Sequence, residues 1–326
     1  MPLDERILPS ISIVIPIYNA ASTLQACLDS LMCLDYPSSK IEILCVDGFS
    51  TDASRKILAS YPVYLIDNPQ RGVVSGRNRG VEAAKGDLIA FSDADCIFDS
   101  SWLRHADSYF DDPEIAGVTG PIELPLDQNT IGKGINLLFQ IATSIAGGGH
   151  SAKVPVIRPA NHLPTCNAIF RASHLKKIMP IPEHLIAGED IAMSHKLKLL
   201  GYKLLSIPDI KVQHYRRSTL RGFTRQMYRY AIARRQVSRI WTELQYPMHF
   251  LTPCIVFLAL LLLGVSFFVN TTIGSIIIIS FWLLTGIIGV IYTRKLGSVF
   301  WQPLIVITFL MSWTLGYIRE ILWQKQ

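Results

Sequence analysis

Three long apolar runs near the C-terminus constrain the fold of this chain more than any other feature. They are Phe250 to Val269, Ile273 to Tyr292 and Val299 to Ile318. Each has the length of about 20 residues that a helix needs to cross a hydrocarbon core of about 30 Å. Between the runs, only Arg294 and Lys295 carry charge. Buried helices of a soluble protein rarely follow one another in this way, so the sequence predicts three transmembrane helices.

The distribution of basic residues predicts how these helices are oriented. Short cytoplasmic loops carry an excess of Lys and Arg. An arginine-rich stretch precedes the first run and Arg294-Lys295 lies in the second loop, so residues 270–272 are expected on the opposite side of the membrane. Residues 1–10 contain three charged residues at positions 4 to 6 and no apolar segment typical of a cleavable signal peptide. We therefore expect a multi-pass protein of the cytoplasmic membrane whose globular part stays in the cytoplasm.

The net charge of +6 conceals two regions of opposite sign. Residues 1–210 hold 18 Lys and Arg against 23 Asp and Glu, whereas residues 211–239 hold nine basic residues and no acidic one. A basic block just before a membrane span is typical of a contact surface for lipid headgroups or diphosphates, and argues against a nucleic-acid partner. The sequence thus predicts a globular domain of residues 1–210, a basic amphipathic interfacial segment of residues 211–249 and a transmembrane region of residues 250–326.

The globular part begins with an alternation of short apolar runs and helix-length segments. The expected strands are Ser12 to Pro16, Ile41 to Val46, Val63 to Ile66 and Leu88 to Phe91. The expected helices between them are Ser22 to Leu34, Thr51 to Ser60 and Val73 to Ala84. This order predicts an α/β domain with a doubly wound, mostly parallel sheet, in which ligands bind beyond the carboxyl ends of the strands.

The following stretch, residues 113–210, is less regular. We expect a strand at Thr165 to Phe170 and a helix that opens at Gly188 and runs to about Leu200. Gly201 is expected to stop that helix. The six cysteines show neither a Cys-x-x-Cys pair nor the spacing of zinc ligands, so they are interpreted as reduced structural thiols.

Polar turns follow three of the predicted strands at their carboxyl ends. They are Pro16-Ile17-Tyr18-Asn19-Ala20, Asp47-Gly48-Phe49-Ser50-Thr51-Asp52 and Asp93-Ala94-Asp95. Asp-x-Asp places two carboxylates on one side of a short turn, where hard oxygens can hold Mg²⁺ or Mn²⁺ against a diphosphate. Surface turns also contain this tripeptide. Three polar turns at one edge of a sheet nevertheless indicate a ligand site with metal-assisted leaving-group chemistry.

Five segments together resemble the family 2 glycosyltransferases of the GT-A fold. They are Ser12 to Asn19, Val46 to Asp52, Gly76-Arg77-Asn78-Arg79-Gly80, Asp93-Ala94-Asp95 and Gly188-Glu189-Asp190. The resemblance covers about residues 10–215 and implies a catalytic domain with a Rossmann-like, doubly wound mixed sheet, a nucleotide-sugar donor and a Mg²⁺ or Mn²⁺ cofactor. One departure is visible. Family members commonly read Asp-Asp-Gly-Ser where this chain has Asp47-Gly48-Phe49-Ser50.

The resemblance also implies roles for residues of the first half. The first loop and the aspartate after the second strand cradle the nucleotide base, which assigns Pro16, Tyr18, Asn19 and Asp47. Tyr18 could instead be a packing tyrosine. The implied roles of Arg77 and Asn78 are to open the next helix and close over the nucleotide, although a solvated arginine and an N-cap asparagine fit the same pattern.

Metal, base and acceptor contacts are implied in the same way. Asp95 is the expected metal ligand, Asp93 contacts the ribose or a metal-bound water, and His214 is a further candidate for the metal or the diphosphate. Asp190 is the expected general base of an inverting transfer, because a carboxylate must take the proton of the acceptor hydroxyl. Glu189 and Asp190 could also simply complement a helix dipole. Glu189 and Asn167 are assigned to the acceptor or diphosphate.

The basic block carries a second resemblance. Gln226-Met227-Tyr228-Arg229-Tyr230 is similar to the Gln-x-x-Arg-Trp motif of membrane-bound polysaccharide synthases, with Tyr in place of Trp. In those enzymes the motif lies on an interfacial helix and lines the acceptor site, which implies that Gln226, Arg229 and Tyr230 contact the acceptor. The spacing predicts an amphipathic helix in the membrane plane, with an apolar stripe of Leu220, Phe223, Met227 and Tyr230 beside a row of Arg217, Arg221 and Arg225. A plain anchoring helix would show the same stripe.

Three functions remain open on these residues. The first is an inverting glycosyltransferase that moves a sugar from a nucleotide sugar, expected to be a UDP-sugar, to a glycan on a polyprenyl diphosphate at the cytoplasmic membrane face. The second is a processive polysaccharide synthase that extrudes its product, although three transmembrane helices are few for forming a translocation channel. The third is a membrane-tethered nucleotide-binding scaffold without catalysis, which would have no need of a separate base. The sugar, the acceptor and the choice between Mg²⁺ and Mn²⁺ stay undetermined.

Overall fold

The protein consists of two compact units, which are described here from a computed structural model covering residues 8–146 and 154–323. The first unit comprises Met1–Pro125, Ala142–His184 and Glu189–Tyr215. The second comprises Leu126–Ile141, Leu185–Gly188 and Arg216–Gln326. Residues 4 to 6, on which the expected absence of a signal peptide rests, lie outside the described residues.

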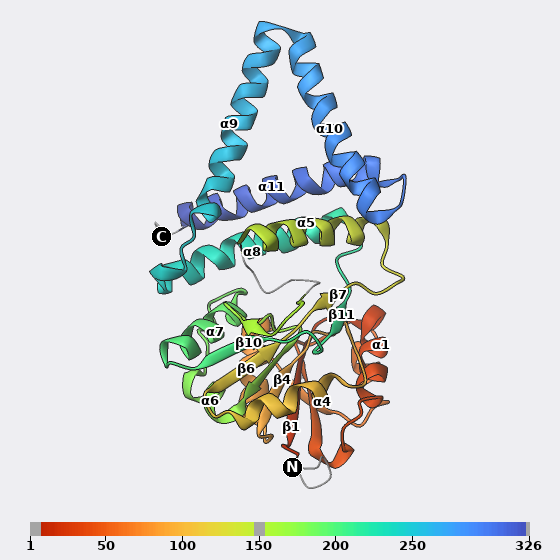
Figure 1. The fold of residues 1–326 in the computed structure, drawn as a ribbon, viewed down its shortest axis with the longest axis vertical. Helices are drawn as coiled ribbons and strands as arrows, with labels where there is room; N and C mark the ends of the chain where they lie inside the picture. Colours follow the sequence, from red (N-terminus) through yellow and green to blue (C-terminus); the bar gives the residue numbers. More distant parts are fainter. Residues whose placement is uncertain (1–7, 147–153, 324–326) are drawn as a thin grey trace. The chain divides into compact units, whose positions relative to one another are not determined.

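The first unit is built on an eight-stranded mixed sheet (Figure 1). Its strands, in spatial order, are β3 (Tyr64–Asp67), β2 (Ile41–Asp47), β1 (Ile11–Ile17), β4 (Leu88–Phe91), β9 (Ala168–Arg171), β6 (Ile115–Thr119), β10 (Lys203–Ser206) and β8 (Arg158–Pro159). β1 to β4 pair in parallel, as do β6 and β10, whereas β9 runs antiparallel to both β4 and β6. The predicted α/β fold with a mixed sheet is therefore confirmed.

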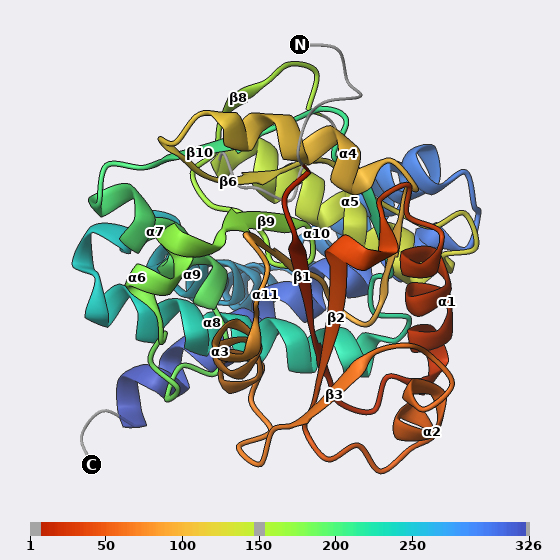
Figure 2. The same cartoon turned by 90° about the horizontal axis from the view of Figure 1, so that it is seen from below.

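Helices cover both faces of this sheet. Side chains of a strand alternate between the two faces. Ile13 and Ile15 of β1 share a buried apolar cluster with Leu24 and Leu28 of α1 (Ala21–Met32). The intervening Val14 instead packs against α3 (Val73–Ala83), where a Cβ on Gly80 would lie 2.2 Å from a Val14 methyl group. The two helices consequently lie on opposite sides of β1 and β2, as Figure 2 shows.

Two elements are shorter than the apolar patterns predict, because turns take up their first residues. The predicted helix at Thr51 to Ser60 is reduced to α2 (Ser54–Leu58), since the Asp52 carboxylate accepts the Ser54 N–H at 2.9 Å. The predicted strand at Thr165 to Phe170 starts only at Ala168, since Asn167 N donates to Pro164 O at 2.9 Å. The helices α4 (Trp102–Asp107), α6 (Ala172–Ile178) and α7 (Glu189–Leu199) complete this unit. Gly201, at φ +84°, ends α7 as predicted.

A small second sheet extends the first unit beyond the predicted boundary at residue 210. Its strands are β5 (Cys96–Phe98), β11 (Val212–His214) and β7 (Ile122–Glu123), in that spatial order. β11 pairs antiparallel with β5 and parallel with β7. These backbone hydrogen bonds tie residues 212–214 to the first unit, which is why that unit ends at Tyr215.

The second unit is helical and contains the apolar runs. It holds most of α5 (Thr130–Ala146), α8 (Leu220–Ile240), α9 (Pro247–Val269), α10 (Thr271–Thr293) and α11 (Ser298–Leu322). By length and composition, three of these helices could cross a membrane, at His249–Val269, Thr271–Thr293 and Ser298–Leu322. α9 and α10 form a hairpin, whereas α11 runs beside α8 (Figure 1).

The apolar stripe of α8 is covered by protein. Phe223 and Met227 are fully buried in a cluster with Ile135 of α5 and Ile305 of α11. α8 and α11 come close at Gly316, where a Cβ would lie 2.4 Å from the carbonyl oxygen of Tyr228. The sequence predicted an amphipathic helix in the membrane plane, but the two central residues of its apolar stripe pack against α5 and α11. The neighbouring Arg217, Arg221 and Arg225 remain exposed.

Candidate active site

The polar turns lie at the carboxyl edge of the large sheet, where β1 and β4 part. Pairing of β1 with β4 ends at Val14, although β1 continues beside β2 to Ile17. The backbone oxygen of Val14 accepts from Ser92 N, just after β4, whereas the backbone oxygen of Ile17 accepts from Gly48 N, just after β2. The even-numbered residues of β1 therefore direct their backbone N–H and C=O groups toward β4. Pro16 occupies the next even position and has no N–H to donate. The sequence thus leaves an unpaired gap at the point where strand order reverses, which is where doubly wound sheets bind ligands.

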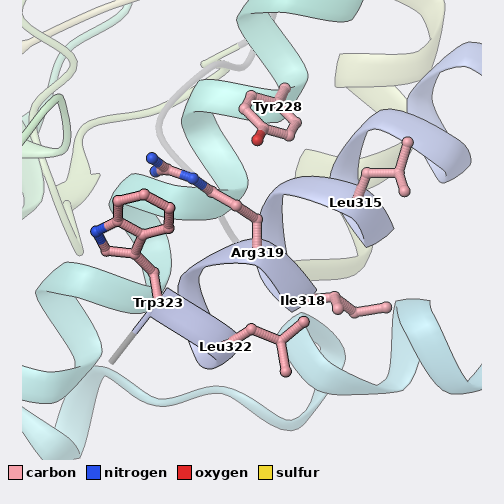
Figure 3. A pocket seen from close by; sticks show the side chains of 6 residues that line it. All are labelled: Tyr228, Leu315, Ile318, Arg319, Leu322 and Trp323. Atoms are coloured by element: carbon pink, nitrogen blue, oxygen red, sulfur yellow. The ribbon is translucent and has the colours of Figure 1, made fainter. Parts of the chain in front are cut away.

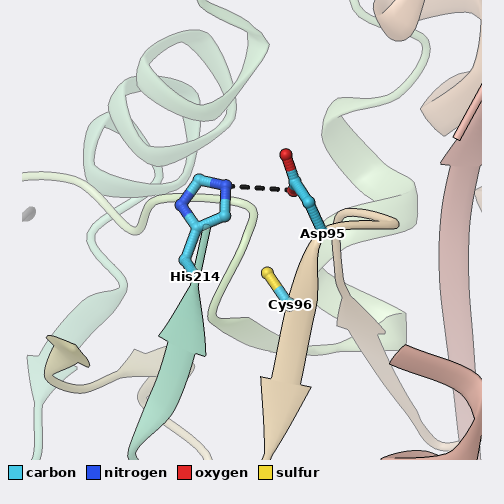
Figure 4. A group of neighbouring side chains, drawn as sticks. All are labelled: Asp95, Cys96 and His214. Carbon is cyan, nitrogen blue, oxygen red and sulfur yellow. Dashed lines mark ion pairs between the residues drawn. The ribbon is translucent and has the colours of Figure 1, made fainter. Parts of the chain in front are cut away.

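Three potential metal ligands meet beside this gap (Figure 4). Asp95 follows β4, Cys96 begins β5, and His214 ends β11 directly opposite Cys96. Nε2 of His214 lies 3.0 Å from Oδ1 of Asp95, and one ligand atom from each of the three residues lies within 4.8 Å of the others. A carboxylate, an imidazole and a thiol can together hold a divalent cation, so the residues present fit such an ion.

Charge around His214 supports a site for a cation. Burial by itself would lower the pKa of His214, but the Asp95 carboxylate and then Cys166 raise it to about 10. Burial raises the pKa of the Cys96 thiol well above its ordinary value. Because metal ligands must be deprotonated, a bound cation would replace the protons that these two groups carry. The sequence predicted Asp95 and His214 but missed Cys96, because the cysteine spacing gives no sign of a pairing that β5 and β11 create.

Arg77 joins the Asp93 turn to the start of α7. Only 3% of this residue is exposed. Its guanidinium donates to Oδ1 of Asp93 at 2.6 Å and forms an ion pair with Oε1 of Glu189. The carboxyl of Glu189 is buried, and burial raises its pKa although Arg77 opposes that rise. The structure therefore places Arg77 as a brace between two acidic residues and not at an exposed position over a nucleotide.

Asp190 lies next to this brace in the first turn of α7 and is half-buried. Its Oδ1 accepts from Ile191 N at 2.8 Å. A carboxylate at a helix N-terminus is stabilised in its charged form by the helix dipole. The arrangement keeps a proton acceptor on α7 while Glu189 turns inward to Arg77, so the two adjacent acids have different surroundings.

The first loop and the turn after β2 are linked by hydrogen bonds. Asn19 N donates to Ser50 Oγ at 2.9 Å, and Asn19 Oδ1 accepts from Thr51 N at 2.8 Å. Asp47 is fully buried and accepts from both the backbone and the hydroxyl of Ser50. Tyr18 stays more than half exposed beside these turns, which excludes the packing role in this structure.

Two other predicted site residues are engaged inside the unit. Asn78 holds Ile181 through both its amide nitrogen and its amide oxygen, at 2.8 and 3.0 Å. Asn167 is fully buried, accepts from Trp102 Nε1 at 2.9 Å and donates to Ile210 O at 2.8 Å. Each of these amides braces segments far apart in the sequence, and we do not include either in the proposed ligand site.

The predicted acceptor motif belongs to the second unit. Gln226 Nε2 donates to the Tyr230 hydroxyl at 3.2 Å along α8, and Arg229 donates to Ile186 O at 3.2 Å. The same unit contains an open groove of about 550 Å³ (Figure 3), lined by Tyr228 of α8 and, from α11 and its end, Leu315, Ile318, Arg319, Leu322 and Trp323. The groove combines apolar side chains with one guanidinium.

Comparison with known proteins agrees with this geometry. "Glycosyltransferase AglE" of Haloferax volcanii is 28% identical over 209 residues, which cover 62% of this chain and 66% of that protein. A second relative, from Methanococcus voltae, is 25% identical over 243 residues, which cover 69% of this chain and 72% of that protein. Its name is "Dolichyl N-acetyl-alpha-D-glucosaminyl phosphate 3-beta-D-2,3-diacetamido-2,3-dideoxy-beta-D-glucuronosyltransferase". The chain thus spans about two thirds of these relatives.

The fold is shared with a solved structure, mannosyltransferase PcManGT from Pyrobaculum calidifontis in complex with GDP-Man and Mn²⁺. That structure has a TM-score of 0.66 and 19% sequence identity, and the match covers 98% of this chain and 89% of that one. The family model "Glycosyl transferase family 2" matches residues 12–178. This match takes in just over half of the chain, including the turns after β1, β2 and β4, so the chain belongs to glycosyl transferase family 2.

Proposed function

We propose that this family 2 glycosyltransferase moves one sugar, with inversion, from a nucleotide sugar to a lipid-linked glycan acceptor at the cytoplasmic membrane face. UDP-sugars are the first donor class to test. One observation carries the proposal: at a single sheet edge, the Asp93–Asp95 turn and the Glu189–Asp190 pair are connected through the buried Arg77. Leaving-group stabilisation and proton abstraction need carboxylates in two such separate places.

The metal side of the site serves the leaving group. Asp95, Cys96 and His214 are the residues that would hold a divalent cation, and Asp93 lies on the same turn as Asp95. Such an ion would neutralise the negative charge that develops on the departing diphosphate. Hard oxygen ligands accept both Mg²⁺ and Mn²⁺, and the PcManGT structure holds Mn²⁺.

Asp190 is the proposed general base. Its carboxylate would take the proton of the acceptor hydroxyl while the anomeric carbon is attacked, which is the role that inversion requires. Glu189 is buried and paired with Arg77, so its carboxylate is not accessible to the acceptor hydroxyl, and it serves to fix the start of α7.

Several features of the second unit support a lipid-linked acceptor. Three helices could cross a membrane. The exposed Arg221 and Arg225 of α8 offer charge for a phosphate or diphosphate, and Gln226, Arg229 and Tyr230 are the proposed acceptor contacts. The groove at Arg319 pairs apolar lining with a cation, as a prenyl chain with an anionic headgroup requires. The Methanococcus voltae relative is named for a dolichyl phosphate-linked acceptor.

The test is a transfer assay with the full chain in membranes, a panel of nucleotide sugars and an extract of lipid-linked acceptors. Mg²⁺, Mn²⁺ and a chelator are compared, and product length is read by mass spectrometry. Addition of one sugar from one donor, lost with the chelator, is the expected result. A ladder of long products would identify a processive synthase, and nucleotide binding without turnover would identify a scaffold.

Asp190→Asn tests the base assignment. Loss of a general base should lower kcat by about a hundred- to ten-thousand-fold, while the dissociation constant of the donor stays close to the parent's. The exposed Asp35→Asn, the same change on the same unit, is the matched control. Equal transfer rates in Asp190→Asn and the parent would contradict the assignment.

A further inference from the structure

A short irregular segment, Leu185–Gly188, leads the chain into α7 and belongs to the second unit. It forms neither helix nor strand, so no ladder of backbone hydrogen bonds holds it. Leu185 is nevertheless only 2% exposed, and the next three residues are half-buried. α7 begins directly after this entry segment, at Glu189, and Asp190 is its second residue. Whatever fixes the entry segment therefore bears on where the Asp190 carboxylate lies.

Two side chains of α8 hold both backbone polar groups of Ile186 in the entry segment. Gln236 Oε1 accepts from Ile186 N at 3.2 Å, and Arg229 Nη2 donates to Ile186 O at 3.2 Å. Half-buried backbone groups outside regular structure need such partners. Because the two bonds act on the N–H and the C=O of one residue, they fix both its place on α8 and its orientation.

Gly188, at the end of the entry segment, packs closely on the same helix. A Cβ on Gly188 would lie 3.0 Å from a methyl carbon of Val237 and 4.0 Å from the Cβ of Ala233. Its φ of +84° is a conformation that glycine adopts without strain. Positions 229, 233, 236 and 237 share one face of a helix. The entry segment is thus seated along one face of α8 by hydrogen bonds at Ile186 and by packing at Gly188.

We propose that Gln236 is a positioning residue for the transfer reaction: together with Arg229, it seats the entry segment and so holds the Asp190 carboxylate where it can take the proton of the acceptor hydroxyl. The inference rests on the proposed function, since Asp190 is the proposed base. A reacting group that is misplaced by about 1 Å can lose about a hundred-fold in rate. Arg229 is also a proposed acceptor contact, which would couple binding of the acceptor to the position of the base.

The test removes the oxygen that accepts from Ile186. Gln236→Leu has a similar size but no acceptor, so kcat in the transfer assay should fall by about ten- to a hundred-fold. Dissociation constants of UDP and GDP, measured by calorimetry on the full chain in nanodiscs with Mn²⁺, should equal the parent's. Gln236→Glu keeps an acceptor oxygen and should restore most of the kcat. Gln245→Leu, an exposed position on the same unit, is the matched control and should transfer like the parent.

A double variant shows whether Gln236 acts through the base. Once Asp190 is replaced by Asn, there is no base left to position, so Asp190→Asn/Gln236→Leu should be no slower than Asp190→Asn alone. A side chain that merely supports the fold would slow both backgrounds by the same factor.

Gly188→Ala tests the seat without touching Gln236. The added Cβ would press on Val237, and the left-handed backbone disfavours alanine, so kcat should again fall while UDP and GDP bind as in the parent. This variant carries the test if Gln236→Leu does not fold.

Three results would overturn the positioning role and leave the proposed function standing. They are a parental kcat in folded Gln236→Leu or, where that variant does not fold, in Gly188→Ala; a loss of equal size in the Asp190→Asn background; and an equal weakening of UDP and GDP binding. Asp190→Asn as active as the parent would overturn the base assignment and this inference with it. A parent chain that transfers no sugar would overturn the proposed function as a whole.

Discussion

At the scale of the residue, burial decides what each polar side chain in the site can do. Arg77, Glu189 and Asp47 are almost inaccessible and are paired inside the protein, whereas Tyr18 and Phe49 face outward. A buried ion pair is costly to desolvate, and the cost is met only while both partners are present. These buried groups therefore fix the geometry of the site, and the exposed ones are available to ligands.

Arg77 gives the clearest residue-scale prediction. Arg77→Met would leave the buried Glu189 carboxylate without its cation, so the free energy of unfolding should fall by about 3–5 kcal/mol. Arg77→Lys keeps the charge, but an ammonium cannot form the fork that reaches both Asp93 and Glu189, so an intermediate loss is expected. Thermal unfolding of the detergent-solubilised chain measures both effects.

Arg79→Met on the same helix is the matched control for this change. Arg79 Nε donates to Gln70 Oε1 at 3.3 Å near the surface, so removal of the Arg79 side chain should cost less than about 0.5 kcal/mol. If Arg77→Met and Arg79→Met unfold at the same temperature, Arg77 does not brace the site.

At the scale of the element, the close crossing of α8 and α11 depends on a missing side chain. A Cβ at Gly316 would lie 2.4 Å from the backbone oxygen of Tyr228 and 3.1 Å from Ala231 Cβ. Gly316→Val should force the helices apart and destabilise the second unit by about 1–3 kcal/mol. Thermal unfolding of purified protein, followed by size-exclusion chromatography, should show a lower midpoint.

Gly264→Val provides the comparison within the same unit. A Cβ at Gly264 would meet nothing within 4 Å, so this variant should unfold at the parent's temperature or slightly above it. The two substitutions add the same atoms to two apolar helices and differ only in what surrounds them. Equal midpoints would show that α8 and α11 do not cross closely at Gly316.

Local sequence patterns predicted these helices and strands well, but they could not predict contacts between residues that are far apart in the sequence. The apolar runs gave β1, β2 and β4 to within one residue at each end, and three apolar helices appear where hydropathy predicted them. Periodicity shows that one face of α8 is apolar, but it cannot show that α5 and α11 cover that face. Likewise, the partner of Arg77 on α7 lies 112 positions away in sequence, and no local pattern connects the two.

At the scale of the whole molecule, acidic residues and basic residues are concentrated in two different segments of the chain. Residues 1–210 carry a net charge of −5, from 18 basic and 23 acidic residues, whereas residues 211–239 carry nine basic residues and no acid. An acidic catalytic half has no general attraction for anions. Contact with an anionic lipid headgroup should therefore depend on the exposed arginines of α8.

The double variant Arg221→Gln/Arg225→Gln tests this dependence. Each basic residue near an anionic surface contributes about 1 kcal/mol, so the KM for a lipid-linked acceptor in nanodiscs should rise by about ten- to thirty-fold at low salt. The KM for the nucleotide sugar should not change, because these arginines are not proposed donor contacts. The effect should shrink as salt is added, since the screening length falls from about 10 Å at 0.1 M to about 3 Å at 1 M.

A lower net charge could by itself raise the acceptor KM. The control must therefore remove the same number of positive charges from a different part of the chain. Lys56→Gln/Lys85→Gln removes two exposed cations from the catalytic unit and should leave the acceptor KM close to the parent's at every salt concentration. If both double variants raise the acceptor KM equally, overall charge governs encounter with the membrane. If neither does, Arg221 and Arg225 take no part in acceptor binding, and the groove at Arg319 becomes the next place to test for recognition of the lipid.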